Sequence, residues 1–415
     1  MTILEQQGAA ASSAARILSA AGTERKNAAL NAIADKLEAK ASNWLAANAE
    51  DVAAAREGGM SEALLDRLAL TEARVQSVAG GVREVAALPD PIGAVINSTT
   101  RPNGLRIDKV RVPMGVIGII YEARPNVTAD AAALCLKAGN ACILRGGKEA
   151  IRSNRAAVAL MREALEEAGL PADAVCLVQD TSRESARELM ELTDYVDVLI
   201  PRGGPKLIRA VAAQSRVPVI RTGEGVCHVY IDREADLDMG AEILYNAKCS
   251  RPSVCNAAEC LLVHEAVAEA FLNKAVPLLD RKQVELRADA AALAILGSRA
   301  VPASDEDWDA EYGDFILAVR TVKDVGEAIA FITAHGTGHS EAIVTKNAET
   351  AQRFLNEIDA AAVYVNASTR FTDGGEFGMG AEIGISTQKM HARGPMGLEE
   401  LTSYKYLVYG EGQVR

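Results

Sequence analysis

Short, continuously apolar segments alternate with amphipathic ones between residues 114 and 231, and this alternation constrains the fold more than any other feature of the sequence. Strands are expected at 115–120, 141–145, 174–178, 196–200, 218–220 and 226–231. Helices are expected between them at 127–138, 150–168, 183–192 and 205–214. Apolar strands separated by helices are typical of a parallel sheet covered on both faces. We therefore predict an α/β domain, which suits a nucleotide without establishing a function.

The same alternation returns from residue 237 to about 366. The expected helices are 238–249, 265–280, 323–334 and 348–357, and the expected strands are 258–263, 315–319, 341–345 and 361–366. Residues 9–88 have apolar positions at helical spacing. A chain of 415 residues exceeds the size of one hydrophobic core. The sequence thus predicts a helical N-terminus followed by two parallel-sheet α/β domains.

Residues 93–113 differ in character, with β-rich arms around the turn Pro102-Asn103-Gly104. We interpret them as a β-hairpin that projects from the main body. Such an arm cannot bury both of its faces alone, so it is expected to pack on another domain or subunit. The tail is Gly-rich at 371–384 and ends in the strand-like segment YKYLVYG.

Charge and cysteine usage limit the possible partners. The formal net charge of −12 disfavours nucleic acid as a partner, because phosphate-backbone binding needs clustered Lys and Arg. The N-terminal stretch lacks the basic start and apolar core of a signal peptide, and the longest apolar run, 112–120, is too short to span a bilayer. Seven cysteines without a secretion signal indicate reduced thiols. We expect a cytoplasmic protein without a membrane segment.

Two glycine-rich loops follow predicted strands and open predicted helices. The first consists of Arg145, Gly146, Gly147 and Lys148, and the second contains Gly203 and Gly204. Helix N-termini favour anions, so two cations in the first loop suit a phosphate-bearing ligand, although an ordinary basic loop is an equal alternative. Two such loops on adjacent strand ends of one sheet favour a nucleotide site.

The segment YEARPNVT (121–128) follows the first strand of the first domain. Its polar residues Glu122, Arg124 and Asn126 lie where a parallel strand delivers its carboxyl end, the usual ligand edge. Asn126 either caps the following helix or donates its amide to an oxyanion.

Three of the seven cysteines lie within CSRPSVCNAAEC (249–260). Their spacing does not match a zinc site, and a structural disulfide is not expected in a cytosolic chain, so we predict no metal here. Cys249 ends a helix and Cys260 lies in an apolar strand, where free cysteine is usually inert packing. Cys255 lies in a loop after Arg251, so its thiol is either a nucleophile with a lowered pKa or an unreactive loop sulfur.

The motifs YEARPNVT, RGGKEAIRSN (145–154) and RPSVCNAAECLLVH (251–264) resemble the gamma-glutamyl phosphate reductase family of the aldehyde dehydrogenase superfamily. The resemblance covers nearly the whole chain. It implies an NADPH-binding domain formed by 1–92 and 114–231, a catalytic domain at 232–368, and an oligomerisation hairpin and tail at 93–113 and 369–415.

The resemblance also implies roles for individual residues. Cys255 matches the catalytic thiol, and Asn126 matches the asparagine that forms the oxyanion hole with the cysteine N–H. The loop 145–148 matches the region that holds the adenosine ribose, where Arg145 and Lys148 would favour the 2′-phosphate of NADPH. Gly203 and Gly204 are expected to contact the same cofactor, and Glu311 matches the glutamate that holds the nicotinamide ribose. Arg251, Lys248 and Arg124 are our candidates for the phosphate of the substrate.

The implied activity is the NADPH-dependent reduction of L-glutamyl 5-phosphate to the 5-semialdehyde in proline biosynthesis, through a cysteine thioester. A homo-oligomer and transfer of substrate from a glutamate 5-kinase are expected. Oxidising members carry a general-base glutamate in an E-L-G-G motif, whereas this chain has RTGEGVCHVYID (221–232) with Glu224 displaced. A reductase of acyl phosphates must keep water from its thioester, which explains the loss of that base.

Three other interpretations stay open. The chain could be another superfamily member acting on a different semialdehyde or a CoA thioester, which activity with CoA instead of phosphate would select. It could be a cysteine hydrolase or acyltransferase that pairs Cys255 with His228 or His391, which activity without a nicotinamide would support. It could also be a non-catalytic NADPH-binding protein, for which an unreactive Cys255 would be the first sign.

Overall fold

The computed structural model describes residues 1–415 apart from the side chain of Ala63. The chain forms two compact units, and each contains its own parallel sheet. The first unit comprises 1–222, 378–384 and 396–415, and the second comprises 223–377 and 385–395. In the described chain, no helix combines the length and the apolar character needed to cross a membrane.

The N-terminus of the first unit is helical, as the sequence predicts. Its helices are α1 (Ile3–Ser19), α2 (Thr23–Ala39), α3 (Ala41–Glu57), α4 (Glu62–Leu68) and α5 (Glu72–Ala87). Helix α1 begins with a capping box, in which the Thr2 hydroxyl accepts from the Glu5 N–H and the Glu5 carboxylate accepts from the Thr2 N–H. Helices α2 and α5 pack on each other and against the helices of the first sheet.

The first sheet has four parallel strands in the order β5-β4-β3-β6. Their bounds are β3 (Val116–Tyr121), β4 (Ala141–Arg145), β5 (Val175–Leu177) and β6 (Val198–Arg202). The helices between and after them are α6 (Pro125–Lys137), α7 (Ile151–Glu167), α8 (Arg183–Glu191) and α9 (Pro205–Gln214). The strand expected at 218–220 is reduced to a single bridge between Val219 and Leu199. The two glycine-rich loops follow β4 and β6, which flank β3, so they lie on either side of β3 and are not adjacent.

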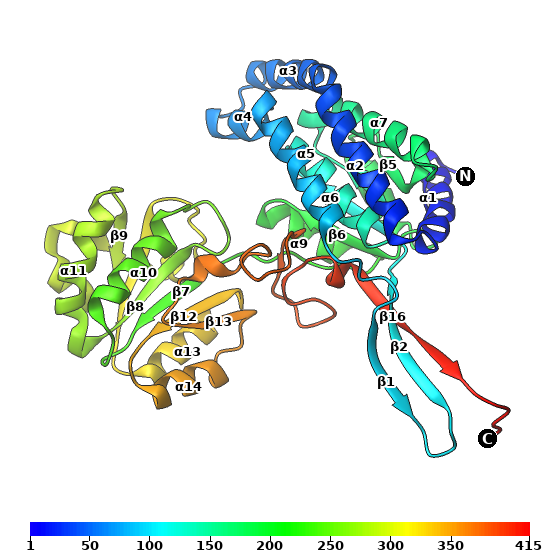
Figure 1. The fold of residues 1–415 in the computed structure, drawn as a ribbon. Coiled ribbons are helices and arrows are strands. Elements are labelled where there is room, and N and C mark those ends of the chain that lie inside the picture. The colour runs from blue at the N-terminus through cyan, green and yellow to red at the C-terminus, as the bar shows by residue number, and fades with distance from the viewer. The chain divides into compact units, whose positions relative to one another are not determined.

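The predicted hairpin is formed by β1 (Val95–Thr100) and β2 (Arg106–Pro113), with Gly104 in a left-handed conformation at its turn. The C-terminal strand β16 (Thr402–Tyr409) pairs antiparallel with β2 along its full length. The resulting three-stranded sheet extends from the rest of the first unit, as Figure 1 shows. Strand β16 is an edge strand.

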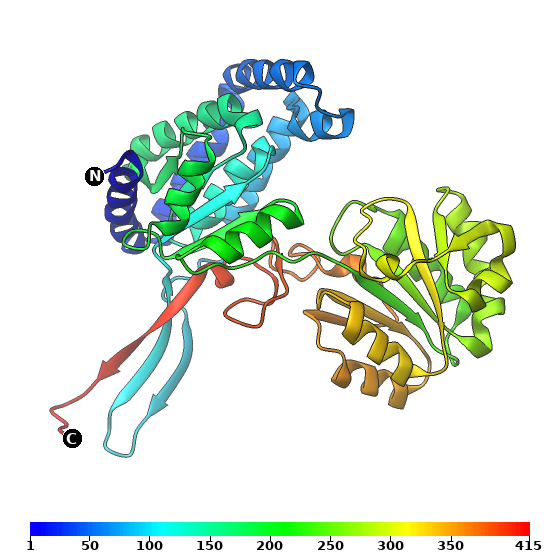
Figure 2. The same cartoon turned by 180° about the vertical axis from the view of Figure 1, so that it is seen from behind.

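The second unit contains a sheet of seven parallel strands in the order β10-β9-β11-β8-β7-β12-β13. Its elements, visible from both sides in Figures 1 and 2, are β7 (Cys227–Ile231), α10 (Leu237–Cys249), β8 (Ala258–His264), α11 (Ala268–Asp280), β9 (Glu285–Ala288), α12 (Ala290–Leu296), β10 (Ala300–Pro302), β11 (Ile316–Val322), α13 (Val325–His335), β12 (Ser340–Val344), α14 (Ala348–Glu357) and β13 (Ala362–Val365). The sequence did not predict β9, α12 and β10. A short pair, β14 (Ile385–Ser386) with β15 (Gly394–Pro395), also belongs to this unit.

The predicted domain boundary is corrected at β7. The sequence places residues 226–231 in the first domain, but β7 pairs with β8 and β12 in the second sheet, and the boundary lies between Thr222 and Gly223. A continuously apolar strand fits the centre of either sheet, so hydrophobicity cannot decide which sheet it joins.

Alternate residues of the central strands enter two separate cores. Val229, Leu261, Val319 and their neighbours pack with α10 and α11, whereas Tyr230, Leu262 and Ala318 pack with residues of α13 and α14. Helices therefore cover both faces of the seven-stranded sheet, which explains why its strands read as continuous apolar runs.

Candidate active site

Cys255 lies in the loop between α10 and β8, as the sequence predicts. Its side chain is partly exposed, whereas the six other cysteines are buried. Cys249 packs in the core with α10 and α11, and Cys260 packs in the core on the other face of the sheet. The three clustered sulfurs thus occupy three different environments, and only Cys255 is accessible to a reagent.

The loop of Cys255 lies at the amino-terminal edge of the seven-stranded sheet. Because β7, β8, β11 and β12 are parallel, their amino ends meet at this edge. The segments that precede these strands contain Gly225, Cys255, Glu311 and His339. The sequence predicts ligands at the carboxyl ends of the strands and does not predict that these four residues lie together at the amino ends.

The backbone of Cys255 is tightly enclosed. A Cβ atom on Gly225 would lie 1.5 Å from the carbonyl oxygen of Cys255, so only glycine fits there. The Cys227 thiol donates to the same carbonyl oxygen over 3.2 Å. Burial raises the pKa of Cys227 well above its usual value, so this neighbouring sulfur stays a neutral donor. The main chain that presents Cys255 is held by packing and by a hydrogen bond.

Asn256, the next residue, is bound by the segment from Thr369 to Thr372. Its side-chain amide nitrogen donates to the carbonyl oxygen of Thr372 over 2.9 Å, and its main-chain carbonyl oxygen accepts from the Thr369 hydroxyl over 2.7 Å. The Thr372 hydroxyl in turn bonds those of Ser340 and Tyr364, at 2.6 and 2.7 Å. Strands β12 and β13 thereby anchor the segment from Thr369 to Thr372, which positions the loop that carries Cys255.

Arg370 belongs to this segment and was not a predicted site residue. Its guanidinium donates to the Asn256 side-chain oxygen and, over 3.1 Å, to the Ser250 hydroxyl. Burial lowers the pKa of Arg370 and the charge of Arg251 lowers it further, while Asp373 and the Cys255 thiolate raise it. Arg251 itself is exposed, as a ligand-binding cation requires. In the sequence, Arg370 could have been noticed only as a cation between the strand expected at 361–366 and the Gly-rich segment 371–384.

Lys248 does not match its predicted role as a phosphate ligand. Its ammonium is fully buried and bonds the Glu259 carboxylate over 2.6 Å. Burial lowers the pKa of Lys248 and raises that of Glu259. The other carboxylate oxygen of Glu259 accepts from the Gly313 N–H over 3.2 Å. The pair joins α10, β8 and the segment before β11, and its ammonium is not available to a substrate.

Glu311 lies in that segment before β11, within the second unit. Its half-buried carboxylate accepts from the Gly225 N–H. Burial raises the pKa of Glu311, and the negative charge of Glu224 adds to the rise. The two glutamates therefore lie near the glycine that encloses Cys255.

His228 is a buried core residue, as we expected for a histidine on an apolar strand. Its Nδ1 lies 2.9 Å from the Glu341 carboxylate, and its ring packs edge-on against Phe331. Burial alone would lower the pKa of His228, but the charge of Glu341 raises it to about 10. Because His228 is fully buried and paired with Glu341, its ring is not available as the partner of Cys255 in a cysteine hydrolase.

In the first unit, Asn126 is the second residue of α6 and does not cap it, because the N-cap is Arg124. Its amide nitrogen donates to the Asp130 carboxylate over 3.1 Å. Burial raises the pKa of Asp130 to about 6, against the Asn126 hydrogen bond and the charge of Arg202. Asn126 is half-buried at the carboxyl end of β3, with Arg124 exposed beside it.

The second glycine-rich loop already binds a carboxylate of the protein. The Glu122 carboxylate accepts from the Gly204 N–H over 3.1 Å at the start of α9. A Cβ on Gly203 would lie 2.7 Å from the carboxyl carbon of Glu122. An anion at this helix N-terminus would compete with Glu122.

The first glycine-rich loop combines an anchored and an exposed cation. Arg145 donates to the carbonyl oxygens of Thr181 and Ser182, at 2.8 and 2.9 Å, and in the described chain its buried Nε lacks a partner. Lys148 is exposed where α7 is about to begin. A Cβ on Gly146 would lie 2.2 Å from the Asn154 side chain, so the loop depends on this glycine.

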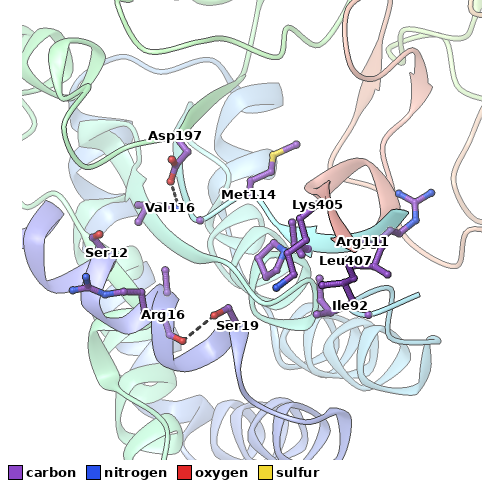
Figure 3. Close-up of a pocket in the computed structure, with 16 residues that line it drawn as sticks. Ser12, Arg16, Ser19, Ile92, Arg111, Met114, Val116, Asp197, Lys405 and Leu407 are labelled. Carbon is purple, nitrogen blue, oxygen red and sulfur yellow. Dashed lines mark hydrogen bonds between the residues drawn. The ribbon is translucent and has the colours of Figure 1, made fainter. Parts of the chain in front are cut away.

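The first unit also contains a pocket of about 620 Å³, which lies away from the two glycine-rich loops. It is lined by α1, the base of the hairpin sheet, and residues near the amino end of β3, including Arg16, Arg111 and Val116 (Figure 3). Because the glycine-rich loops lie at the carboxyl ends of the strands, this pocket is not part of the candidate nucleotide site.

The chain belongs to the aldehyde dehydrogenase family: the model of the family described as "Aldehyde dehydrogenase family" matches residues 4–294 and 300–407. Its relatives include the gamma-glutamyl phosphate reductase of Clostridium perfringens, 58% identical over 409 residues that cover 99% of this chain and 98% of the relative. That of Carboxydothermus hydrogenoformans is 58% identical and covers 98% of this chain and 97% of the relative. The crystal structure of the Thermotoga maritima gamma-glutamyl phosphate reductase matches over 100% of both chains, with a TM-score of 0.98 and 49% identity.

Proposed function

We propose that the protein reduces L-glutamyl 5-phosphate to L-glutamate 5-semialdehyde and phosphate with NADPH, as a step of proline biosynthesis. The observation that carries the proposal is Cys255, the one partly exposed cysteine of seven, on a loop held by Gly225 and Asn256. It lies in a chain that is 58% identical, over nearly its full length, to named gamma-glutamyl phosphate reductases.

The Cys255 thiolate attacks the acyl carbon, a carbon–sulfur bond forms, and the bond to the phosphate oxygen breaks with its electron pair leaving on phosphate. Asn126 and the Cys255 N–H donate to the oxyanion of the tetrahedral intermediate. Arg251, with Arg124 as a second candidate, binds the phosphate. The product leaves when the carbon–sulfur bond breaks and the thiolate is restored.

The nicotinamide cofactor, when bound, supplies the hydride that reduces the thioester. We assign its binding to the first unit, where Arg145, Gly146, Gly147 and Lys148 fit an anionic nucleotide because Lys148 is exposed and the buried Nε of Arg145 has no partner among the described residues. Two cations there favour NADPH over NADH. Gly203 and Gly204 allow close approach of the cofactor, in competition with Glu122, and Glu311 holds the nicotinamide ribose.

The exclusion of water fits the arrangement of the second unit. Glu224 and Glu311 lie on the Gly225 side of Cys255, where the half-buried Glu311 carboxylate is held by the Gly225 N–H. A thioester protected from activated water survives until it is reduced.

Phosphate-dependent oxidation of glutamate 5-semialdehyde, with NADP⁺ and NAD⁺ in parallel, tests substrate, direction and cofactor together. We expect activity that requires phosphate and prefers NADP⁺, and its loss in Cys255→Ala. Activity with CoA in place of phosphate, or full activity in Cys255→Ala, would contradict the proposal.

We further propose a cytoplasmic homo-oligomer assembled through the hairpin sheet. Tyr404, Tyr406 and Val408 alternate along the edge strand β16 and are 50%, 58% and 56% exposed, an apolar row that a partner would cover. Light scattering should show an oligomer that Tyr406→Asp dissociates, and a monomeric native protein would refute this. Direct supply of the acyl phosphate by a glutamate 5-kinase remains a prediction.

A further inference from the structure

Two cations converge on the loop that carries Cys255 in the second unit. Arg251 is exposed within the loop, and Arg370 reaches it from the segment after β13. The guanidinium of Arg370 bonds Ser250 and Asn256, which stand immediately outside the five residues from Arg251 to Cys255. It therefore spans the base of the loop that carries the nucleophile.

We propose that Arg370 is a phosphate-binding residue of the reaction, which with Arg251 holds the phosphoryl group of the substrate beside Cys255 and keeps the phosphate as it leaves. The inference deepens the proposed function, because it names where the phosphate binds. The planar guanidinium suits a phosphoryl group, which offers several oxygens to parallel N–H donors.

The charges around Arg370 support an anion at this position. Burial and the positive charge of Arg251 both disfavour the charged form of Arg370. An anion bound beside the guanidinium would offset both effects. The Cys255 thiolate and Asp373 act in the opposite direction. Because its guanidinium bonds the side chain of Asn256, the residue next to Cys255, Arg370 lies beside the loop that carries the attacking thiol.

The position of Arg370 is also well defined. Its own carbonyl oxygen accepts from the Asn256 amide over 3.3 Å, and Thr369 and Thr372 bind Asn256 on either side of it. Buried hydroxyls of Ser340 and Tyr364 hold Thr372 to the sheet. A cation supported by this network loses little side-chain entropy when an anion binds.

The test uses alkylation of Cys255 by iodoacetamide, followed by mass spectrometry, with inorganic phosphate as the protecting probe. Phosphate should slow alkylation of the native protein. In Arg370→Gln the half-protecting phosphate concentration should rise at least tenfold, and Arg370→Lys should fall between the two, because an ammonium keeps the charge and loses the planar donors. Arg281→Gln, at the exposed carboxyl end of α11, is the matched control and should behave as the native protein.

The KM for phosphate in semialdehyde oxidation should rise by the same factor in Arg370→Gln. A purely structural role would instead lower kcat and leave phosphate protection unchanged, and that result would overturn the inference. It would also be overturned if phosphate failed to protect a readily alkylated native Cys255. If Arg370→Gln does not fold by circular dichroism, Arg370→Lys decides alone. Phosphate protection that depends on Arg370, in a protein without reductase activity, would reject the proposed function and keep the anion site.

Discussion

Gly225→Ala tests whether packing against the Cys255 backbone sets the position of the nucleophile. A Cβ atom there would lie 1.5 Å from the Cys255 carbonyl oxygen and 2.5 Å from its carbonyl carbon. Relief to 3.0 Å, the closest approach that a real Cβ tolerates, requires a shift of about 1.5 Å. The backbone of Gly225 is outside the left-handed region, so space alone opposes the alanine.

The clash is with backbone atoms, which cannot rotate away as a side chain can. The shift would also break the hydrogen bond from Cys227 to the same oxygen. We expect the free energy of unfolding to fall by about 1–3 kcal/mol, as for other overpacked sites. A nucleophile displaced by more than about 1 Å should lose on the order of 100-fold in kcat.

Steady-state kinetics and urea unfolding measure the two effects in one preparation. Gly80→Ala in α5 is the matched control, because nothing lies within 4 Å of its ideal Cβ apart from its chain neighbours and the backbone of its own helix. It should raise stability by about 0.5–1 kcal/mol and leave kcat unchanged. If Gly225→Ala kept kcat within about threefold of the native value, packing at Gly225 would not position the thiol.

Three further predictions follow from the two units. Asn126→Ala should lower kcat by about 100-fold to 1,000-fold with little change in the rate of Cys255 alkylation, and an unchanged kcat would exclude Asn126 from the oxyanion hole. Glu259→Gln leaves the buried Lys248 ammonium without its carboxylate and should cost about 3–5 kcal/mol in urea unfolding, whereas the double variant Lys248→Met with Glu259→Leu should recover most of it; equal losses in both would contradict the ion-pair argument. Burial alone would raise the pKa of Asp307, but hydrogen bonds from Ser304, Arg287 and Tyr312 lower it to about 2, so its stabilisation is present above pH 3.8 and is lost as the pH falls toward 2. Asp307→Asn should therefore be destabilised by about 1–3 kcal/mol at pH 7, with a gap that narrows below pH 4, and a gap independent of pH would refute the assignment.

Much of the fold could be predicted because local rules decide it. The apolar runs at 115–120, 141–145 and 258–263 form β3, β4 and β8, and the turn at Gly104 joins the predicted hairpin. Periodicity and turn chemistry act within a few residues, so they can be read directly from the chain. The loop position of Cys255 between a helix and a strand followed from the same signals.

Other features depended on which segments meet in space. The sequence did not predict that β7 joins the second sheet or that Lys248 is buried against Glu259. Nor did it predict that Arg370 contacts the loop of Cys255, 115 positions away in the chain. Burial, ion pairing and the approach of distant segments are properties of packing, and a side chain of given chemistry suits either a solvated or a buried setting until its partners are known. The sequence alone therefore determined most of the elements, the family and, as a prediction, the identity of the nucleophile. The tertiary structure decided which charges surround that nucleophile, because only the parallel order of β7, β8, β11 and β12 gathers those segments at one edge.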